Sequence, residues 1–388
     1  MSARIAAMAS AVSVLLAAAA ALPSETAALG RQIFLDPSLS VSGRLACASC
    51  HSPAHAYGSP DGGAAPSGGE RLDQPPLRTV PSLRYLDQTP RFTRHYYIDH
   101  GSGLEDEGPA GGFMLDGRAD SLHAQALIPW LDAAEMGNAS IEALAQRLQR
   151  AAYAPRLQQL FGPQLFDRPR QAVAAAALAL ERFELEDPSF HPYSSRYDAF
   201  LAGRGTLSER ELRGLSLYAD PRKGNCAECH PHARGAAGRG PDFTDYAYHA
   251  LGVPRNPALA ANADARFYDM GLCGPRRQDL REETVYCGYF KTPTLRNSAR
   301  RRQFFHNGRF GTLEEVLRFY AERDTAPERF YPTVRGIVRR FDDLPAAYRA
   351  NVDTADPPFG RQRGQPPALS AVEIEDIAAF LRTLDDAD

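Results

Sequence analysis

The stretches Cys47-Ala48-Ser49-Cys50-His51 and Cys226-Ala227-Glu228-Cys229-His230 decide the fold. In a Cys-x-x-Cys-His unit, the two thiols reach the two vinyl groups on one edge of a porphyrin, and the adjacent histidine turns beneath the ring to bind iron. A zinc or redox Cys-x-x-Cys with a bystander histidine is the alternative. Two complete units in a chain with only 6 cysteines and 10 histidines make that alternative negligible. The sequence therefore predicts two covalently bound haem c groups, with His51 and His230 as proximal iron ligands.

The blocks before the two motifs repeat each other. Gly30-Arg31-Gln32-Ile33-Phe34-Leu35-Asp36-Pro37 precedes the first motif, and Gly214-Leu215-Ser216-Leu217-Tyr218-Ala219-Asp220-Pro221 precedes the second. Glycine, an aromatic residue, aspartate and proline stand at the same offsets in both. Internal self-similarity of this kind indicates a duplicated module. We expect each block to end a short helix just before its cysteines.

Helical patterns dominate the rest of the chain. Residues 171–185 are rich in alanine and leucine, contain no glycine or proline, and predict a long buried helix. Strand-like alternation is scarce, and residues 52–112 have the glycine and proline clusters of a loop. Three Ser/Thr-x-x-Glu capping boxes predict helix starts at Ser208 with Glu211, Thr312 with Glu315 and Ser370 with Glu373. The last opens a terminal helix with one apolar face, formed by Ile374, Ile377, Leu381 and Leu384.

Length and charge limit the classes of protein. A chain of 388 residues fits two domains of ordinary size, and a net charge of -3 argues against nucleic acid or an anionic membrane surface as the main partner. Pro188, Pro192 and Gly203-Arg204-Gly205 interrupt the helices, which places the predicted domain boundary near residues 190–205. We expect a signal peptide over 1–22, an N-terminal haem domain over 23–200 and a C-terminal haem domain over 201–388.

The first residues have the pattern of an export signal. Arg4 is followed by an apolar run over residues 5–21, and Leu22-Pro23-Ser24 breaks the run. A retained N-terminal membrane anchor is the alternative, and in both cases the folded part lies outside the cytoplasm; the periplasm is the expected location. No second stretch of spanning length follows, so no membrane span is expected after cleavage. The remaining cysteines, Cys273 and Cys287, then favour a disulfide, with two free buried thiols as the alternative.

Several further motifs follow one another in a fixed order. They are Leu29-Gly30-Arg31-Gln32-Ile33-Phe34, Asp116-Gly117-Arg118-Ala119, Gln125, Glu135-Met136, Phe290-Lys291-Thr292-Pro293-Thr294-Leu295-Arg296-Asn297, and His306-Asn307-Gly308 followed by Thr312-Leu313-Glu314-Glu315-Val316. In this order they resemble the bacterial di-haem cytochrome c peroxidases and their relative MauG, the methylamine-utilisation maturation enzyme. The resemblance covers nearly the whole mature chain. It implies a mainly α fold, with two cytochrome c-like haem domains, long loops, and a haem held between helices in each domain.

The resemblance also assigns roles to particular residues. Peroxide reacts at the N-terminal haem of this family, where Glu135 would be the acid/base and Gln125 a hydrogen-bonding partner. Two ordinary surface polar residues are the alternative. The C-terminal haem stores an electron and takes a second axial ligand fourteen residues past the His306 position, as Met in the peroxidases and Tyr in MauG-like members. That position is Tyr320, for which an ordinary core aromatic is the alternative; His306 is expected to be a pocket residue and no ligand.

Three departures from the family pattern change the expectations. The peroxidases carry a gating histidine in a loop after the first motif, but no histidine lies between His55 and His95, so the N-terminal site is expected to be open. The positions of the family's inter-haem calcium are Thr79, Arg301 and Gln303; an arginine makes calcium doubtful, and its guanidinium could replace the ion. The tryptophan between the haems is Leu115, and Trp130, the single tryptophan of the chain, lies beyond Gln125.

The resemblance favours a periplasmic peroxidase that reduces hydrogen peroxide at the N-terminal haem. Electrons would come from a small cytochrome c or cupredoxin through the C-terminal His/Tyr haem. The first alternative is a MauG-like oxidase that uses peroxide to modify residues of a partner protein. The second is a non-catalytic di-haem electron-transfer cytochrome.

Overall fold

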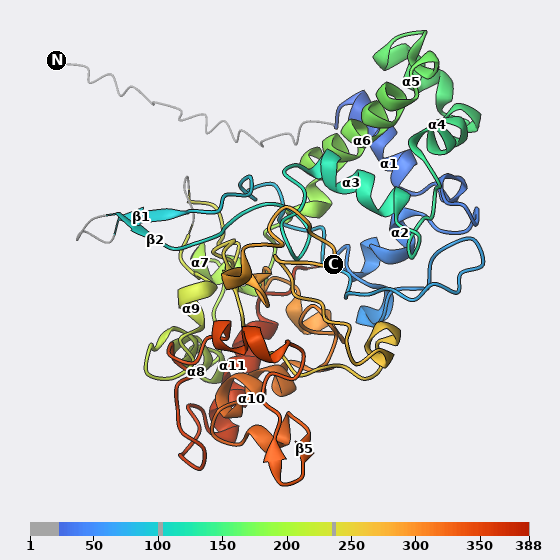
Figure 1. Cartoon of the computed structure of the whole chain (residues 1–388). Helices are drawn as coiled ribbons and strands as arrows, with labels where there is room; N and C mark the ends of the chain where they lie inside the picture. The colour runs from blue at the N-terminus through green and yellow to red at the C-terminus, as the bar shows by residue number, and fades with distance from the viewer. Residues whose placement is uncertain (1–22, 100–103, 235–237, 388) are drawn as a thin grey trace, which may run out of the picture.

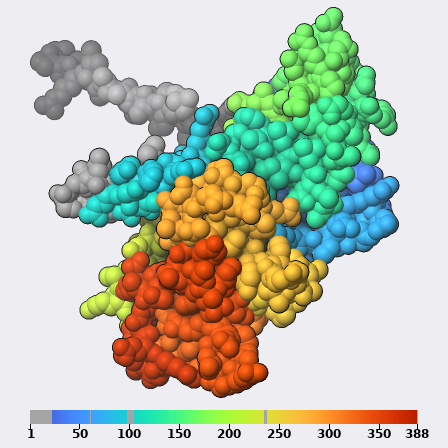
Figure 2. Space-filling view, viewed as in Figure 1, coloured from blue at the N-terminus to red at the C-terminus, as the bar shows by residue number. Residues whose placement is uncertain are grey.

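The structure is a computed structural model that describes residues 23–99, 104–234 and 238–387; the predicted signal peptide over 1–22 lies outside the described residues. A group of N-terminal helices and a group of C-terminal helices stand at opposite ends, and long loops lie between them (Figure 1). In the space-filling view, the segment before the C-terminal helices (amber) lies between the N-terminal helices (green) and the C-terminal part (red) (Figure 2). The helices are α1 (Glu25–Phe34), α2 (Cys47–Cys50), α3 (Leu122–Leu131), α4 (Ile141–Arg150), α5 (Ala154–Phe161), α6 (Pro169–Glu186), α7 (Arg196–Leu201), α8 (Glu209–Ala219), α9 (Cys226–Cys229), α10 (Leu313–Glu322) and α11 (Ala371–Arg382).

Strands are few in the described part of the chain. They form two-stranded antiparallel sheets: β1 (Tyr97–Asp99) with β2 (Leu104–Asp106), β3 (Tyr248–His249) with β4 (Phe290–Lys291), and β5 (Thr333–Val334) with β6 (Ile337–Val338). The helix-rich character predicted from the sequence is therefore confirmed. The β1–β2 hairpin is a correction, because residues 52–112 were expected to be loop throughout. Its strands are three residues long, which is too short for a clear alternating pattern.

The predicted helices form where their patterns place them. Helix α6 spans the alanine-rich run predicted over 171–185, and each of the three predicted capping boxes is present at the start of α8, α10 and α11. In each box the N-cap hydroxyl accepts a hydrogen bond from the backbone of the glutamate, which satisfies one of the free N–H groups of the first turn. Helix α11 ends at Arg382, and Leu384 beyond it is fully buried.

The repeated sequence block produces the same helix crossing twice. Helix α1 packs against α6, and α8 packs against α11. A Cβ atom at Gly30 would lie 1.9 Å from the Ala179 carbonyl oxygen, and one at Gly214 would lie 2.0 Å from the Asp376 carbonyl oxygen. Only glycine allows the helices to approach so closely. The shared glycine of the two blocks is thus explained by backbone contact in both halves.

Two large apolar clusters lie in the two halves. Helices α1, α3, α4 and α6 form the first, which includes Phe34, Trp130 and Phe190. Helices α8, α10 and α11 form the second cluster, which also includes Tyr197 of α7. The chain passes from one cluster to the other within the region of the predicted boundary, and the division into domains stays a prediction.

The predicted disulfide between Cys273 and Cys287 is confirmed, with Cα atoms 5.0 Å apart. Both cysteines are buried and lie in the segment between β3 and β4. Within residues 23–99, 104–234 and 238–387, no helix is both long and apolar enough to cross a membrane.

Candidate functional site

The two Cys-x-x-Cys-His motifs have the same local geometry. Each forms one helical turn, α2 or α9, after which the histidine backbone N–H donates to the carbonyl of the first cysteine at 2.8 Å. The His51 Nδ1 lies 3.1 Å from the Tyr57 carbonyl oxygen, and the His230 Nδ1 lies 2.8 Å from the Phe243 carbonyl oxygen. Because a carbonyl can only accept, Nδ1 carries the proton in both rings. The lone pair is then on Nε2, where an iron ligand needs it.

Burial keeps both imidazoles neutral. It lowers the pKa of His51 to about 4, and it lowers the pKa of His230 as well. None of the motif cysteines, Cys47, Cys50, Cys226 and Cys229, is in a disulfide. Free thiols beside a neutral histidine with an available Nε2 are the donor set that covalent haem attachment requires. Both sites therefore fit haem c.

A large cavity adjoins the first motif. It spans about 1220 Å³ of space, which includes space open to solvent, and its lining is mostly apolar. Cys47, Cys50 and His51 line it together with the sequence-predicted residues Gln125 and Glu135. These two residues come from α3 and from the turn after it, about 75 residues or more beyond the motif. The structure thus brings the predicted acid/base and its polar partner to the cavity beside the first motif.

The carboxyl of Glu135 has a pKa well above its usual value. Burial, and next the nearby Asp132 carboxylate, raise its pKa to about 7, and the positive charges of Arg276 and Arg118 oppose the shift. Its backbone is fixed, since its N–H donates to the Asp132 carbonyl at 3.0 Å. A carboxyl with this pKa holds and releases a proton equally well near neutral pH.

The side chain of Gln125 is buried on α3, one turn after the Ser121 N-cap. Within the described residues its amide makes no hydrogen bond to another group, although it lines the cavity. A buried amide normally finds a partner. The Gln125 amide is therefore available to a molecule bound in the cavity.

Sequence reasoning missed a second acid in this cavity, Glu184 near the end of α6. Its side chain is 6% exposed, its Oε2 has no hydrogen-bond partner among the described residues, and burial raises its pKa to about 8. The signal was present in the sequence. Glu184 follows Ala176 and Leu180 at four-residue steps, so a carboxylate lies on the apolar face of a buried helix.

Paired arginines surround the same cavity. The Arg78 guanidinium bridges Asp269 at 2.6 Å and Asp116 at 2.7 Å, and Arg118 also binds Asp116 at 2.7 Å. Arg276 pairs with Asp132, the neighbour of the Glu135 turn. These pairs hold the Asp116-Gly117-Arg118 motif rigidly at the cavity wall.

Tyr320 lies on α10 beside the second motif. Burial raises the pKa of its phenol, and the neighbouring Cys229 and Cys226 raise it further. Its ring stacks on Phe359 at 5.6 Å between centroids, and the phenol makes no hydrogen bond to any described residue. The geometry leaves the oxygen free for a metal, as the proposed axial role requires. Whether it binds iron stays a prediction.

His306 is held by its neighbours. Its ring stacks on Phe290 at 3.7 Å between centroids, and its Nε2 lies 3.3 Å from Asp343 Oδ2. His306 is buried, and it lines neither the cavity beside the first motif nor the polar cavity lined by Arg301. That His306 is no ligand stays a prediction.

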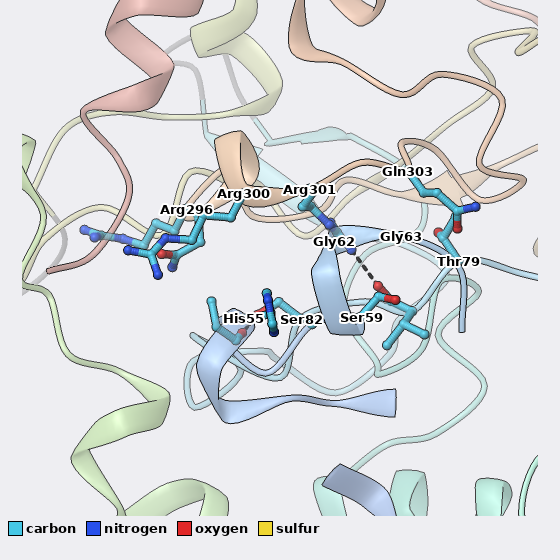
Figure 3. A pocket seen from close by; sticks show the side chains of 14 residues that line it. His55, Ser59, Gly62, Gly63, Thr79, Ser82, Arg296, Arg300, Arg301 and Gln303 are labelled. Carbon is cyan, nitrogen blue, oxygen red and sulfur yellow. Dashed lines mark hydrogen bonds between the residues drawn. The ribbon is translucent and has the colours of Figure 1, made fainter. Parts of the chain in front are cut away.

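Thr79, Arg301 and Gln303, which the family comparison groups together, do meet in space. They line a second, polar cavity between the two halves, which spans about 400 Å³ including space open to solvent (Figure 3). His55 lines this second cavity too. Among the described residues that line the larger cavity, His51 is the only histidine, and the absence of a gating histidine stays a prediction.

Leu115 also lines the larger cavity. Its carbonyl accepts a hydrogen bond from the Lys291 backbone N–H at 3.0 Å, which places it where the two halves of the chain meet. Trp130 is 1% exposed in the first apolar cluster and does not line the cavity. The structure therefore puts leucine, and not tryptophan, at the junction.

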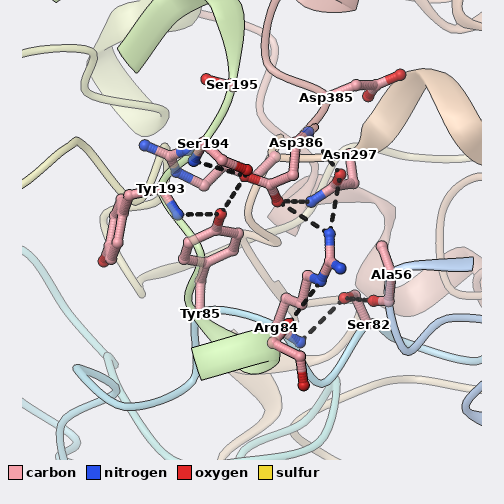
Figure 4. Close-up of polar contacts among 12 residues, drawn as sticks. Ala56, Ser82, Arg84, Tyr85, Tyr193, Ser194, Ser195, Asn297, Asp385 and Asp386 are labelled. Atoms are coloured by element: carbon pink, nitrogen blue, oxygen red, sulfur yellow. Dashed lines mark hydrogen bonds and ion pairs between the residues drawn. The ribbon is translucent and has the colours of Figure 1, made fainter. Parts of the chain in front are cut away.

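A polar network near the C-terminus joins the halves (Figure 4). The carboxylate of Asp386 accepts hydrogen bonds from the Tyr85 hydroxyl at 2.6 Å, from Asn297 Nδ2 at 2.6 Å and from Arg84 at 3.1 Å. Asp386 is 2% exposed, so these charge-assisted bonds are strong. The network fixes the loop after the first motif to the end of the chain.

Comparison with known proteins supports the same picture. Residues 24–206 match the protein family described as di-haem cytochrome c peroxidase. The chain is 34% identical to the methylamine utilization protein MauG of Paracoccus denitrificans over 76% of this chain and 73% of that one. It is 27% identical to the cytochrome c551 peroxidase of Nitrosomonas europaea over 76% of this chain and 72% of that one.

A solved structure extends the likeness to the whole fold. The diheme peroxidase BthA from Burkholderia thailandensis superposes with a TM-score of 0.84 and 38% identity, over 94% of this chain and 87% of that one. The sequence relatives and the solved structure thus point to one family. This chain also has two haem-attachment motifs, a duplicated helix crossing and a cavity lined by acids. This chain belongs to the di-haem cytochrome c peroxidase family that includes MauG.

Proposed function

We propose that this protein is a periplasmic di-haem c-type peroxidase. Hydrogen peroxide is reduced at the N-terminal haem, held by Cys47, Cys50 and His51. Electrons come from a small cytochrome c or cupredoxin and pass through the C-terminal haem, held between His230 and Tyr320. Two cytochrome c-like domains, over 23–200 and 201–388, would each carry one haem.

One observation carries the proposal: Glu135, with a pKa of about 7, lines the same cavity as His51. A haem held there by Cys47, Cys50 and His51 would supply the electrons for cleavage of the peroxide O–O bond. The Glu135 carboxylate takes a proton from one peroxide oxygen and returns it to the oxygen that leaves as water. The Gln125 amide N–H donates a hydrogen bond that orients the peroxide. The absence of a histidine other than His51 among the described lining residues favours a site that needs no opening step.

The test is steady-state turnover of the purified di-haem protein. A reduced small cytochrome c or a reduced cupredoxin is mixed with hydrogen peroxide, and oxidation of the donor is followed optically. Sustained oxidation that depends on both peroxide and protein supports the peroxidase. Rapid reaction with peroxide but no turnover with either donor would contradict it.

The second candidate is a MauG-like oxidase that uses peroxide to modify a partner protein. Tyr320 favours it, because its phenol oxygen is free beside Cys226 and Cys229 and a phenolate ligand lowers the haem potential relative to methionine. Leu115 speaks against it, because leucine has no accessible oxidation state and cannot relay charge between the haems. We therefore rank the peroxidase first. The non-catalytic electron-transfer cytochrome is ranked last, because an acid near its working pKa lines the cavity.

A further inference from the structure

Arg301 is enclosed by protein and has no acidic partner. Its guanidinium donates one hydrogen bond, to the Val80 carbonyl oxygen at 2.7 Å, and no described carboxylate pairs with it. Burial alone lowers the pKa of this arginine. A guanidinium withdrawn from water and left without a negative charge is unfavourable unless an anion joins it.

Arg301 differs in this respect from every other arginine of the two cavities. Each of the others forms an ion pair with an aspartate of the chain. The pairs are Arg78 with Asp116 and Asp269, Arg118 with Asp116, Arg276 with Asp132, Arg296 with Asp198, and Arg300 with Asp385. Among the described arginines that line the two cavities, Arg301 is thus the one whose charge has no carboxylate of the chain beside it.

A second polar group in the same cavity lacks a partner. The Ser59 Oγ is buried, the residue is 8% exposed, and the hydroxyl has no hydrogen-bond partner among the described residues. Arg301 extends from the C-terminal half toward the segment that carries Ser59 and Gly62 (Figure 3). One orphaned cation and one orphaned hydroxyl in one small cavity describe a site for a carboxylate-sized anion.

This polar cavity adjoins the larger cavity beside the first motif, and the two share part of a wall. Thr79 and Val80 line both. The wall that they share is fixed to the C-terminal half, since the Thr79 hydroxyl donates to the Phe305 carbonyl at 2.8 Å and the Thr79 N–H donates to the His306 carbonyl at 2.9 Å. The Arg301 guanidinium donates to the Val80 carbonyl oxygen in this shared wall, so it lies close to the edge of the larger cavity.

We propose that Arg301 is the counter-ion of a propionate carboxylate of the N-terminal haem, with the Ser59 hydroxyl as a second donor. This inference rests on the proposed haem binding at His51. Because the guanidinium is part of the chain, its positive charge cannot dissociate as a bound ion can. Binding of the haem and contact between the two halves therefore need no divalent cation at this position. The positive charge also favours the reduced form of the iron, because reduction lowers the positive charge that faces it.

The experiment compares three variants with wild type. Arg301→Gln removes the charge, and Arg301→Lys keeps it. Arg302→Gln is the matched control, because the Arg302 side chain is exposed. Its contact with the N-terminal half is a hydrogen bond from its backbone N–H to the Gly62 carbonyl oxygen, which the substitution keeps. The intact mass of each protein is first measured to show that two haems are attached. Resonance Raman spectra then report the propionate bending band, and spectroelectrochemistry gives the midpoint potential of each haem.

In Arg301→Gln we expect a shifted propionate band and a lower midpoint potential for one haem. Arg301→Lys and Arg302→Gln should stay close to wild type. If Arg301→Gln does not fold, Ser59→Ala is the second variant and should shift the band in the same direction by less. Added inorganic phosphate, or a calcium chelator, should leave the wild-type spectrum unchanged.

Several results would overturn the proposal. They are an unchanged band and potential in Arg301→Gln or, where that variant fails to fold, in Ser59→Ala; an equal shift in Arg302→Gln; and a wild-type spectrum that responds to phosphate, which would make the ligand a free anion. A response to the chelator would assign the site to a metal ion. Absence of haem from wild type would instead contradict the proposed function, so the two failures are distinguishable.

Discussion

Glu135→Gln tests the proposed acid/base in the N-terminal cavity. The shift in the pKa of Glu135 from 4.5 to about 7 corresponds to about 3 kcal/mol of preference for the neutral carboxyl. At pH 7 about half of the molecules then carry the carboxylate that accepts the peroxide proton. The wild-type rate with peroxide should rise with pH through about 7 and level off above it.

Glutamine keeps the size and polarity of the side chain but cannot exchange a proton. We expect the second-order rate with peroxide to fall by roughly 10²–10⁴-fold, the usual contribution of a positioned acid/base group. The step in the pH profile near 7 should disappear. Both haem spectra should remain, since Glu135 is no ligand.

The assay is stopped-flow mixing with peroxide, followed in the Soret band from about pH 5 to about pH 9, a range that brackets the pKa of Glu135. Glu70→Gln is the control, because Glu70 is an exposed glutamate on the neighbouring loop. A loss of only a few fold, or the same pH step in the variant, would refute the role of Glu135 and assign it to structure.

Four further outcomes are expected. Replacing Cys226 and Cys229 with alanine should lower the intact mass by one haem; an unchanged mass would contradict attachment there. Tyr320→Phe should alter only the low-spin haem signal in the electron-spin spectrum, whereas no change would make Tyr320 a packing residue. The folded-state pKa of Glu184 is about 8, above its usual 4.5, so the free energy of unfolding should fall as pH rises from 4.5 through 8. Glu184→Gln should remove this loss and raise the free energy of unfolding near pH 9 by at most about 5 kcal/mol. Urea denaturation measures this difference. Leu115→Trp should let peroxide produce a near-infrared band shared by both haems, and the same band already in wild type would reverse our ranking of the two functions.

Local chemistry explains which predictions succeed. The spacing Cys-x-x-Cys-His has only one turn of chain to span, so its geometry follows from the residues themselves, and both motifs form it. The capping boxes are equally local, and the helix over 171–185 needs only its uninterrupted alanine-rich composition. The disulfide between Cys273 and Cys287 could be predicted by counting cysteines once export was assumed.

Contacts between distant segments explain what sequence reasoning missed. The β1–β2 hairpin is too short to leave a pattern. The Asp386 network depends on Tyr85 and Asn297, which are 301 and 89 residues away. No local pattern could predict that these three side chains share one carboxylate.

The sequence by itself determined the haem motifs, the repeated helix, the helix-rich class and the family resemblance. Only the tertiary structure decided that Glu135 has a pKa near 7, that Glu184 is an unpaired buried acid, and that Arg301 lacks an acidic partner. The reason is physical. Helices and covalent motifs are set by near neighbours, whereas the charge of a buried group is set by desolvation and by partners that folding brings from far along the chain.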